Sequence, residues 1–217
     1  NEVGVADNKG EIIITPKYNI LPFWESYERD SMIRVLSLDN YKFGFYNHND
    51  RLVAECIYDE AFPFKNGLCK VGKNLKWGYI NKKGEEIIPV KYDDVSEFTE
   101  GLALVCYKLK YGYVNTIGVE TIPIQFYEAS EFKNGYARVK NENDAYGIIN
   151  TQGTLIIPPV QQNILINNAT NSYFTEGLAI VKQNSLYGYS NDQGNVVIPC
   201  KYTWADFFVK NRALVSD

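Results

Sequence analysis

The chain has 217 residues, 45% hydrophobic and 22% charged, which is enough to bury a sizeable core. Its formal net charge is −4 and no basic patch interrupts it, so we expect no nucleic-acid partner. No apolar run approaches the ~20 residues that a membrane-spanning helix needs, so we expect no membrane insertion. The chain starts with Asn1, and its start therefore indicates no cellular compartment.

A glycine recurs along the chain at intervals of about 34 residues or slightly more, which indicates an internal repeat. The glycines are Gly4, Gly44, Gly78, Gly112, Gly147 and Gly188. This spacing predicts a single domain, 1–217, of six units. Their approximate bounds are 1–40, 41–74, 75–108, 109–143, 144–184 and 185–217.

The sequence pattern of each unit predicts three β-strands, which we call a, b and c in chain order. In the clearest copy, strand a is Lys76–Asn81, and a short turn that ends at Gly84 leads to strand b, Glu85–Tyr92. The link Asp93–Gly101 then leads to strand c, Leu102–Tyr107. A tight turn joins strand c to the next strand a, so strands c, a and b should form an antiparallel meander.

The recurring glycine lies inside strand a, where glycine weakens a strand unless something needs the missing side chain. We expect a large ring from a neighbouring strand or unit to lie over its bare backbone. The residue before the glycine is usually aromatic, and we interpret these rings as packing residues rather than as ligand contacts. They are Phe43, Trp77, Tyr111, Tyr146 and Tyr187.

Two further recurring residues constrain the backbone. Proline cannot donate a ladder hydrogen bond, so strand b should end, bulge or lie at a sheet edge at Pro89, Pro123, Pro158 and Pro199. A third glycine precedes strand c, and Asn211 replaces it in the last copy. Because Asn is the other residue that best tolerates a left-handed backbone, this position should have a positive φ.

The pattern W/Y-G-Y/I-x-N-x-x-G-x-x-I-I-P-x-x-Y-D, followed by F-x-x-G-x-A-x-V, resembles the WG-repeat family. The resemblance spans essentially the whole chain, although Val3–Asp7 has no aromatic residue and the fifth copy departs after Pro159. It implies a largely bacterial, all-β repeat protein that acts as a binding or scaffold module, and it carries no catalytic residues to transfer. A weaker resemblance is to cell-wall-binding repeats, whose units are shorter.

We therefore predict an all-β fold of six tandem ~34-residue units, each with three antiparallel strands. The sequence starts with a strand a, Val3–Asp7, and ends with a strand c, Arg212–Val215. Pairing these two strands would remove two exposed edges, so we expect a closed propeller-like ring. An open superhelical β-repeat array is the alternative.

Strand c contains a variable position that alternates with small apolar residues. Period-two alternation places it on the face opposite the core, where it would suit a binding surface. Two insertions, Ile20–Asp30 and Gln162–Tyr173, add aromatic residues to this candidate surface. Its members are Arg34, Lys70, Leu104, Tyr136, Arg138, Ile180, Trp24, Tyr27 and Tyr173. An ordinary solvated or inter-unit face is the alternative.

The sequence offers no catalytic, cofactor-binding or metal-binding constellation. His48, the only histidine, lies in a predicted turn, and no C-x-x-C pair occurs. We interpret the acidic pairs Asp59-Glu60 and Asp93-Asp94 as solvated loops or as acceptors for backbone N–H groups. Cys56 and Cys200 occupy the same place in separated copies, beyond the ~7 Å reach of a disulfide, so we expect the cysteines to be thiols.

These observations favour a non-enzymatic module that presents an extended repeat surface to a protein or another macromolecular partner. One alternative is a carbohydrate or cell-wall recognition module, which needs exposed aromatic side chains. The other is an enzyme whose pocket is built by the insertions, around His48 or the acidic loops.

Overall fold

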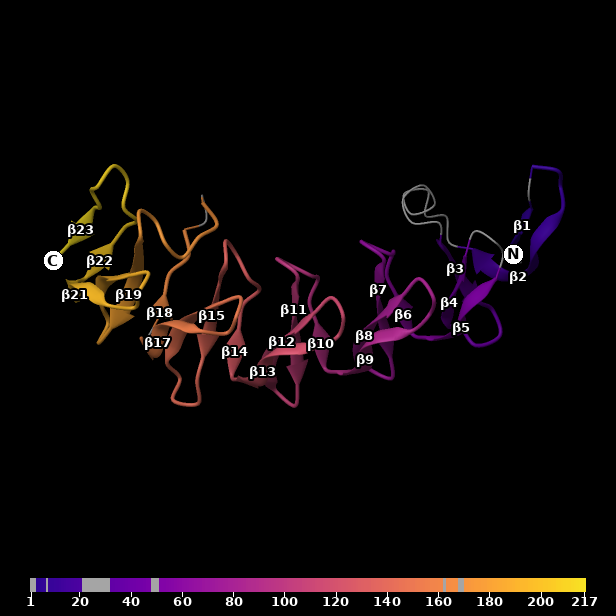
Figure 1. Ribbon diagram of the computed structural model, residues 1–217, viewed down its shortest axis with the longest axis horizontal. Coiled ribbons are helices and arrows are strands. Elements are labelled where there is room, and N and C mark those ends of the chain that lie inside the picture. The colour runs from indigo at the N-terminus through magenta and orange to yellow at the C-terminus, as the bar shows by residue number, and fades with distance from the viewer. Residues whose placement is uncertain (1–2, 7, 21–31, 48–50, 162, 168–169) are drawn as a thin grey trace. The chain divides into compact units, whose positions relative to one another are not determined.

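The computed structural model describes residues 3–6, 8–20, 32–47, 51–161, 163–167 and 170–217 (Figure 1). The chain divides into two compact units, Asn1–Val95 and Ser96–Asp217, which we treat separately. Every regular element among the described residues is a β-strand, so the all-β prediction is confirmed. In this part of the chain no helix is long and apolar enough to cross a membrane.

The first unit contains two antiparallel sheets. The first sheet has the order β1 (Val3–Ala6), β2 (Ile12–Ile20), β3 (Met32–Ser37), β4 (Phe43–Asn47), β5 (Leu52–Tyr58). The second has the order β6 (Glu60–Ala61), β7 (Leu68–Lys73), β8 (Lys76–Asn81), β9 (Glu86–Tyr92). The short strand β10 (Asp94–Val95) ends this unit.

The second unit continues the same pattern. Its strands in chain order are β11 (Leu102–Tyr107), β12 (Lys110–Asn115), β13 (Glu120–Phe126), β14 (Glu128–Ala129), β15 (Tyr136–Lys140), β16 (Tyr146–Asn150), β17 (Leu155–Gln161), β18 (Asn163–Ile164), β19 (Leu178–Gln183), β20 (Leu186–Asn191), β21 (Val196–Tyr202), β22 (Trp204–Ala205) and β23 (Val215–Ser216). Strands β14–β17 and β18–β21 form two four-stranded sheets, and β22 pairs with β23.

The predicted c–a–b meander is confirmed, because β7 pairs with β8 and β8 with β9. The prediction of three strands per unit is wrong, because the link after strand b contributes a fourth. In β6, for example, Glu60 pairs with Gly72 and Ala61 with Val71 of the following strand c. The first copy also departs from the prediction, since β2 pairs with both β1 and β3 and so joins the sheet of the second copy.

Strands β1 and β23 each lie at the edge of their own sheet. The closed ring, in which these two edges would pair, stays a prediction. The single domain of six units, 1–217, also stays a prediction.

The strand-a glycine is required by the backbone of strand b, not by a ring, so that expectation was wrong. A Cβ atom on Gly78 would lie 2.4 Å from the Ile88 carbonyl oxygen, closer than real Cβ contacts come. Strand b comes this close because it bulges: Tyr79 pairs with Ile88, whereas Trp77 pairs with Tyr92. The same clash would occur at Gly44, Gly112, Gly147 and Gly188.

The predicted place of the strand-b proline is confirmed. Pro89 lies in this bulge, and β9 is an edge strand of its sheet. Its missing N–H group therefore breaks no ladder hydrogen bond.

The turn between strands a and b is held by an asparagine. In the clearest copy, Gly84 N donates to the Asn81 carbonyl oxygen at 2.9 Å, while Asn81 Oδ1 accepts from Lys83 N at 2.8 Å and Glu85 N at 3.0 Å. Equivalent bonds recur at Asn115, Asn150 and Asn191. The predicted hairpin is therefore confirmed.

The predicted positive φ before strand c is also confirmed. Gly101 has a φ of 81° and Asn211 a φ of 60°. The preceding residue shares this geometry, since Glu100 has a φ of 51°. Two successive left-handed residues close a very tight hairpin, in which Thr99 and Leu102 exchange backbone hydrogen bonds.

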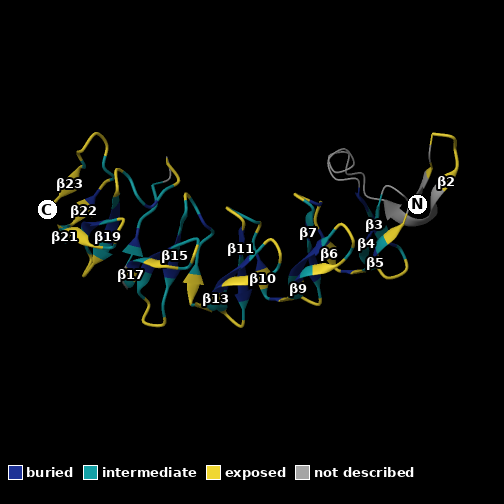
Figure 2. Cartoon of the chain, viewed as in Figure 1, coloured by how far each residue is buried: buried dark blue, intermediate teal, exposed yellow. Residues whose placement is uncertain are grey.

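The core lies along strands c and a, together with a buried residue of strand b such as Ile88, while the turns are exposed (Figure 2). In the first unit Val71, Ile80 and Phe45 are buried in one cluster. The link phenylalanine packs on the aromatic residue that follows the strand-a glycine: the ring centroids of Phe45 and Phe64 lie 5.1 Å apart. The same contact, at 4.8 and 4.9 Å, joins Tyr113 to Phe132 and Tyr189 to Phe208. The link is thus anchored at its middle.

We predict that Gly78→Ala lowers the free energy of unfolding by about 1–3 kcal/mol, the usual cost of overpacking, because its Cβ overlaps the Ile88 carbonyl. Urea denaturation measures this change. Gly67→Asn is the control, because nothing lies within 4 Å of a Cβ there and Asn tolerates the φ of 82°. Equal stability of Gly78→Ala and the wild type would show that the bulge does not require the glycine.

Each of the four cysteines is present as a thiol. A thiol reagent, applied under denaturing and non-reducing conditions, should therefore label Cys56, Cys69, Cys106 and Cys200 in every molecule. Mass spectrometry that finds fewer labels would contradict this expectation.

Candidate functional site

The variable position of strand c faces the next repeat. Arg34 Nη1 donates to the Ala61 carbonyl oxygen, and Lys70 Nζ donates to the Val95 carbonyl oxygen. In the second unit, Arg138 Nη1 lies 3.3 Å from the Ile164 carbonyl oxygen. Since Ala61, Val95 and Ile164 each end a two-residue link strand, these bonds join strand c of one repeat to the link that follows its own strand b.

The same cations lie over the aromatic ring that precedes the strand-a glycine. Arg34 Cζ is 5.2 Å from the Phe43 centroid, and Lys70 Nζ is 4.7 Å from the Trp77 centroid. Arg138 Cζ is 4.7 Å from the centroid of Tyr146. These distances are within the ~6 Å range of cation–π attraction. We call the combination of cation, ring and link carbonyl the cation bridge.

Three copies have an apolar residue in place of the cation; in the last copy it is Leu214, which is 71% exposed, and in the other two it is packed against the next link. Leu104 packs at the margin of a core cluster to which Ala129 of the next link strand also belongs. Ile180 is only 1% exposed and packs in a cluster with Ala205. The prediction that Ile180 lies on a solvent-facing surface is therefore wrong, because both faces of this strand are covered by protein.

The two predicted aromatic members that the structure describes, Tyr136 and Tyr173, pack in one core cluster rather than on an exposed surface. Tyr136 is half-buried, with its ring centroid 4.9 Å from that of Phe174. Tyr173 is 3% exposed and its hydroxyl lies 3.0 Å from Ser130 Oγ, so its prediction as a surface residue is wrong. Trp24 and Tyr27 lie outside the described residues, as does His48.

The interpretation of the acidic links as hydrogen-bond acceptors is confirmed. Asp59 Oδ2 accepts from Asn74 N at 2.7 Å, and Asp94 Oδ1 accepts from Val95 N at 2.8 Å. Asp59 also forms an ion pair with Lys42. Among the described residues, no group of three or more His, Cys, Asp or Glu side chains is arranged to hold a metal ion.

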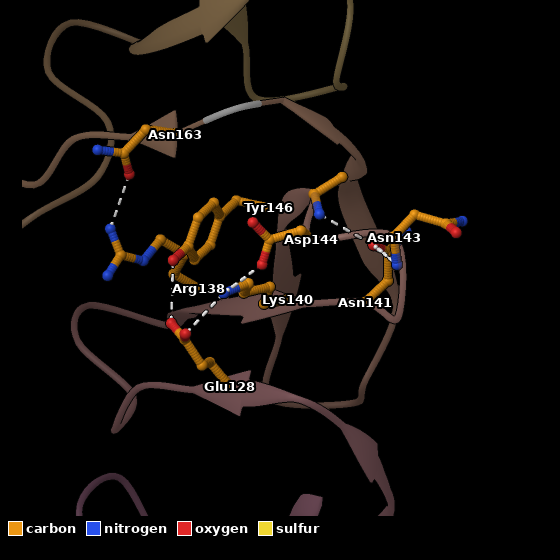
Figure 3. Close-up of polar contacts among 9 residues, drawn as sticks. Glu128, Arg138, Lys140, Asn141, Asn143, Asp144, Tyr146 and Asn163 are labelled. Atoms are coloured by element: carbon orange, nitrogen blue, oxygen red, sulfur yellow. Dashed lines mark hydrogen bonds and ion pairs between the residues drawn. The ribbon is translucent and has the colours of Figure 1, made fainter.

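A polar cluster surrounds Glu128 in the second unit (Figure 3). Lys140 Nζ lies 2.7 Å from Glu128 Oε1, and the Tyr146 hydroxyl donates to Glu128 Oε2 at 2.9 Å. Asp144 Oδ1 lies 2.5 Å from the same Lys140 nitrogen. Strands β14, β15 and β16 thus contribute one side chain each to a network in which two carboxylates share one ammonium group.

The network holds its members in their ordinary charge states. The hydrogen bond from Lys140 lowers the pKa of the Glu128 carboxyl, and Asp144 together with Glu128 raises the pKa of Lys140. Burial and the bond to Glu128 raise the pKa of the Tyr146 hydroxyl. All three pKa values move away from neutrality, whereas a general acid or base works best with a pKa near the operating pH. The cluster is therefore suited to binding and structure rather than to proton transfer.

A shallow cavity of about 330 Å³ lies beside this cluster, between β13 and β17. Its lining includes Lys110, Gln125, Tyr127, Glu142, Asn143 and Leu155. The Lys110 ammonium lies 3.0 Å from the centroid of the Tyr127 ring. The volume is at the lower end of the range, roughly 300–1,000 Å³, that small-molecule sites occupy.

The sequence reasoning missed a set of exposed apolar residues at the tips of the c-to-a turns. Leu75 is 91% exposed with a φ of 60°, and Leu109 is 82% exposed with a φ of 62°. Tyr41, in the longer turn of the second copy, is 72% exposed with a φ of 55°. A signal was present: leucine stands at a turn position where glycine or asparagine is usual.

Comparison with solved structures finds weak similarity. Kluyveromyces lactis Hsv2 is 9% identical, with a TM-score of 0.36, over 82% of this chain and 63% of that one. Its variant with loop 6CD replaced by a Gly-Ser linker is 12% identical, with a TM-score of 0.38, over 77% and 61%. The WD40 β-propeller domain of Doa1 is 12% identical, with a TM-score of 0.31, over 77% and 64%.

The chain thus spans less than two thirds of each of these structures, and similarity at this level carries no argument about its fold or function. No curated protein matches the chain.

Comparison with family models gives a clear result. The model described as WG containing repeat matches residues 4–26, 43–77, 77–108, 111–143, 146–161, 171–187 and 187–217. These segments cover most of the chain and coincide with the strands and turns described above. The chain therefore belongs to the WG containing repeat family.

Proposed function

We propose that the chain is a non-enzymatic binding or scaffold module that docks a protein partner on the tips of its c-to-a turns. The observation that carries this proposal is the exposure of Leu75 and Leu109 in left-handed backbone. A left-handed conformation costs a residue with a Cβ roughly 1–2 kcal/mol. Since both side chains are in solvent, the fold offers no burial to offset that cost.

A partner would change this balance. Burying one leucine side chain contributes about 1.5–3 kcal/mol, so a protein that covers a leucine tip gains affinity directly. In the second unit, the turns at Asn184–Ser185 and Glu142–Asp144 carry no large apolar residue. The leucine tips are therefore a property of particular copies, as expected when individual repeats specialise for contact.

The use of polar groups within the fold also supports a scaffold function. The cation bridge and the acidic links use their charges within the fold, as the bonds of Arg34, Lys70 and Asp59 illustrate.

One observation supports the alternative function, recognition of a carbohydrate or cell wall. It needs exposed aromatic side chains, and Tyr41 and Tyr127 are 72% and 44% exposed.

The double variant Leu75→Asn, Leu109→Asn tests the proposal. Asparagine tolerates the left-handed turn, so we expect the free energy of unfolding to stay the same or to rise. Loss of two leucine contacts should weaken capture of a partner at least tenfold. The measurement is quantitative affinity capture by the intact chain from an extract of its source organism, together with urea denaturation.

Ile117→Asn is the matched control, because Ile117 is 74% exposed but lies in the a-to-b turn, at the other end of strand β12. The supporting result is a protein captured by the wild type and by Ile117→Asn but not by the double variant. Equal capture by all three chains would contradict docking at the c-to-a tips.

A further inference from the structure

The cavity between β13 and β17 lies where the chain departs from its own repeat. In two earlier copies, the residue after strand b is an aspartate that pairs with the lysine at the start of strand a, as in Lys42–Asp59 and Lys76–Asp93. In the next copy Tyr127 takes the place of the aspartate. Its ring receives Lys110 in a cation–π contact at 3.0 Å, so the lysine keeps a partner, and both side chains line the cavity.

The second departure is in the c-to-a turn on the other side of the cavity. The turns at Asn74–Leu75 and Lys108–Leu109 have two residues between paired ends. The turn of the following copy has three, Glu142–Asp144, since Asn141 N bonds to the Ala145 carbonyl oxygen at 3.0 Å. The added residue brings Glu142 and Asn143 into the cavity lining.

This longer turn is fixed in place. Asn141 Oδ1 accepts from Asn143 N and from Ala145 N, each at 3.0 Å. Asn141 Nδ2 donates to the Pro159 carbonyl oxygen of β17 at 3.1 Å. Lys140 and Asp144, which flank the turn, form an ion pair. The two departures therefore line one cavity whose turn is ordered before any ligand binds, which reduces the entropy cost of binding.

The chemistry of the lining narrows the ligand class. Gln125, Glu142 and Asn143 are exposed and offer two carboxamides and one carboxylate, while the one cation in the lining, Lys110, lies on the Tyr127 ring. A phosphate would need converging cations or backbone N–H groups. A hydroxyl both donates and accepts, so neighbouring hydroxyls match amide and carboxylate groups, and the C–H face of a sugar ring matches an aromatic side chain.

From this arrangement we propose that the cavity binds a neutral saccharide unit. Tyr127 supplies the aromatic platform, and Glu142 and Asn143 bond the hydroxyl groups. Neither Leu75 nor Leu109 lines the cavity, so this proposal is tested independently of the protein-docking proposal.

Saturation-transfer NMR on the intact chain tests the site with three neutral probes: maltotriose, cellotriose and N,N′,N″-triacetylchitotriose, each at millimolar concentration. We expect transfer to at least one of them. Tyr127→Asp should weaken that binding at least tenfold, because it restores the residue of earlier copies, removes the platform and leaves Lys110 an ion-pair partner. Tyr127→Phe should retain binding, and Glu142→Gln should weaken it less than Tyr127→Asp does.

Tyr41→Ala is the control, because Tyr41 is an exposed tyrosine that does not line the cavity. Thermal unfolding verifies that Tyr127→Asp is folded. Retained binding in Tyr41→Ala together with loss in a folded Tyr127→Asp supports the site. The proposal is overturned if none of the three trisaccharides receives saturation from the wild type. It is also overturned if Tyr127→Asp binds as well as the wild type.

Discussion

The close approach of strand b to the glycine of strand a is the contact on which each repeat depends. At Gly78 the Ile88 carbonyl oxygen occupies the place of a side chain, because strand b bulges there. A bulge bends a strand and increases its twist. Beyond it, Tyr92 still pairs with Trp77, and the chain then leaves this sheet to form the next link strand. The glycine, the bulge and the transfer of the chain to the next sheet are therefore one structural device.

The packing of each sheet against the link of the next repeat determines which side chains of strand c are buried. Where another repeat follows, strand c is covered on one face by its own repeat and on the other by the next link, so a side chain on either face meets protein; in the last copy Leu214 remains exposed. At the variable position a cation reaches a backbone carbonyl, as Arg138 does, or an apolar residue packs instead, as Ile180 does. Burying a charge without partners is costly, and the ring and the carbonyl together compensate for it.

The parts of this fold that depend on neighbouring residues could be predicted from the sequence. The Asn81–Gly84 turn, the positive φ at Asn211 and the bulge at Pro89 follow from the conformational limits of Gly, Asn and Pro. The link strand β6 could not be predicted in this way, because two residues carry no periodic pattern and pair only once the next repeat is present. The burial of Ile180 was missed for the same reason: alternation separates two faces but does not say that both are covered.

The residues of the candidate sites could likewise be predicted only in part from the sequence. The leucines at the turn tips and Tyr127 were visible as departures from the repeat, but their exposure became evident only in three dimensions. Arg34 and Lys70 were singled out as variable residues, and the structure places them in the cation bridge.

The proline in the bulge has a consequence for how such a protein avoids misassembly. Tandem copies place near-identical strands at very high local concentration, which favours pairing between the wrong sheets and growth into cross-β fibres. In the sheet β6–β9 the outer strand is β9, and Pro89 with its bulge interrupts the row of N–H groups that another strand would need. Pro123, Pro158 and Pro199 stand at the equivalent place in β13, β17 and β21. Each of these four units therefore carries its own obstacle to edge-to-edge pairing, whereas β5 has Glu55 at the equivalent place and bulges without a proline.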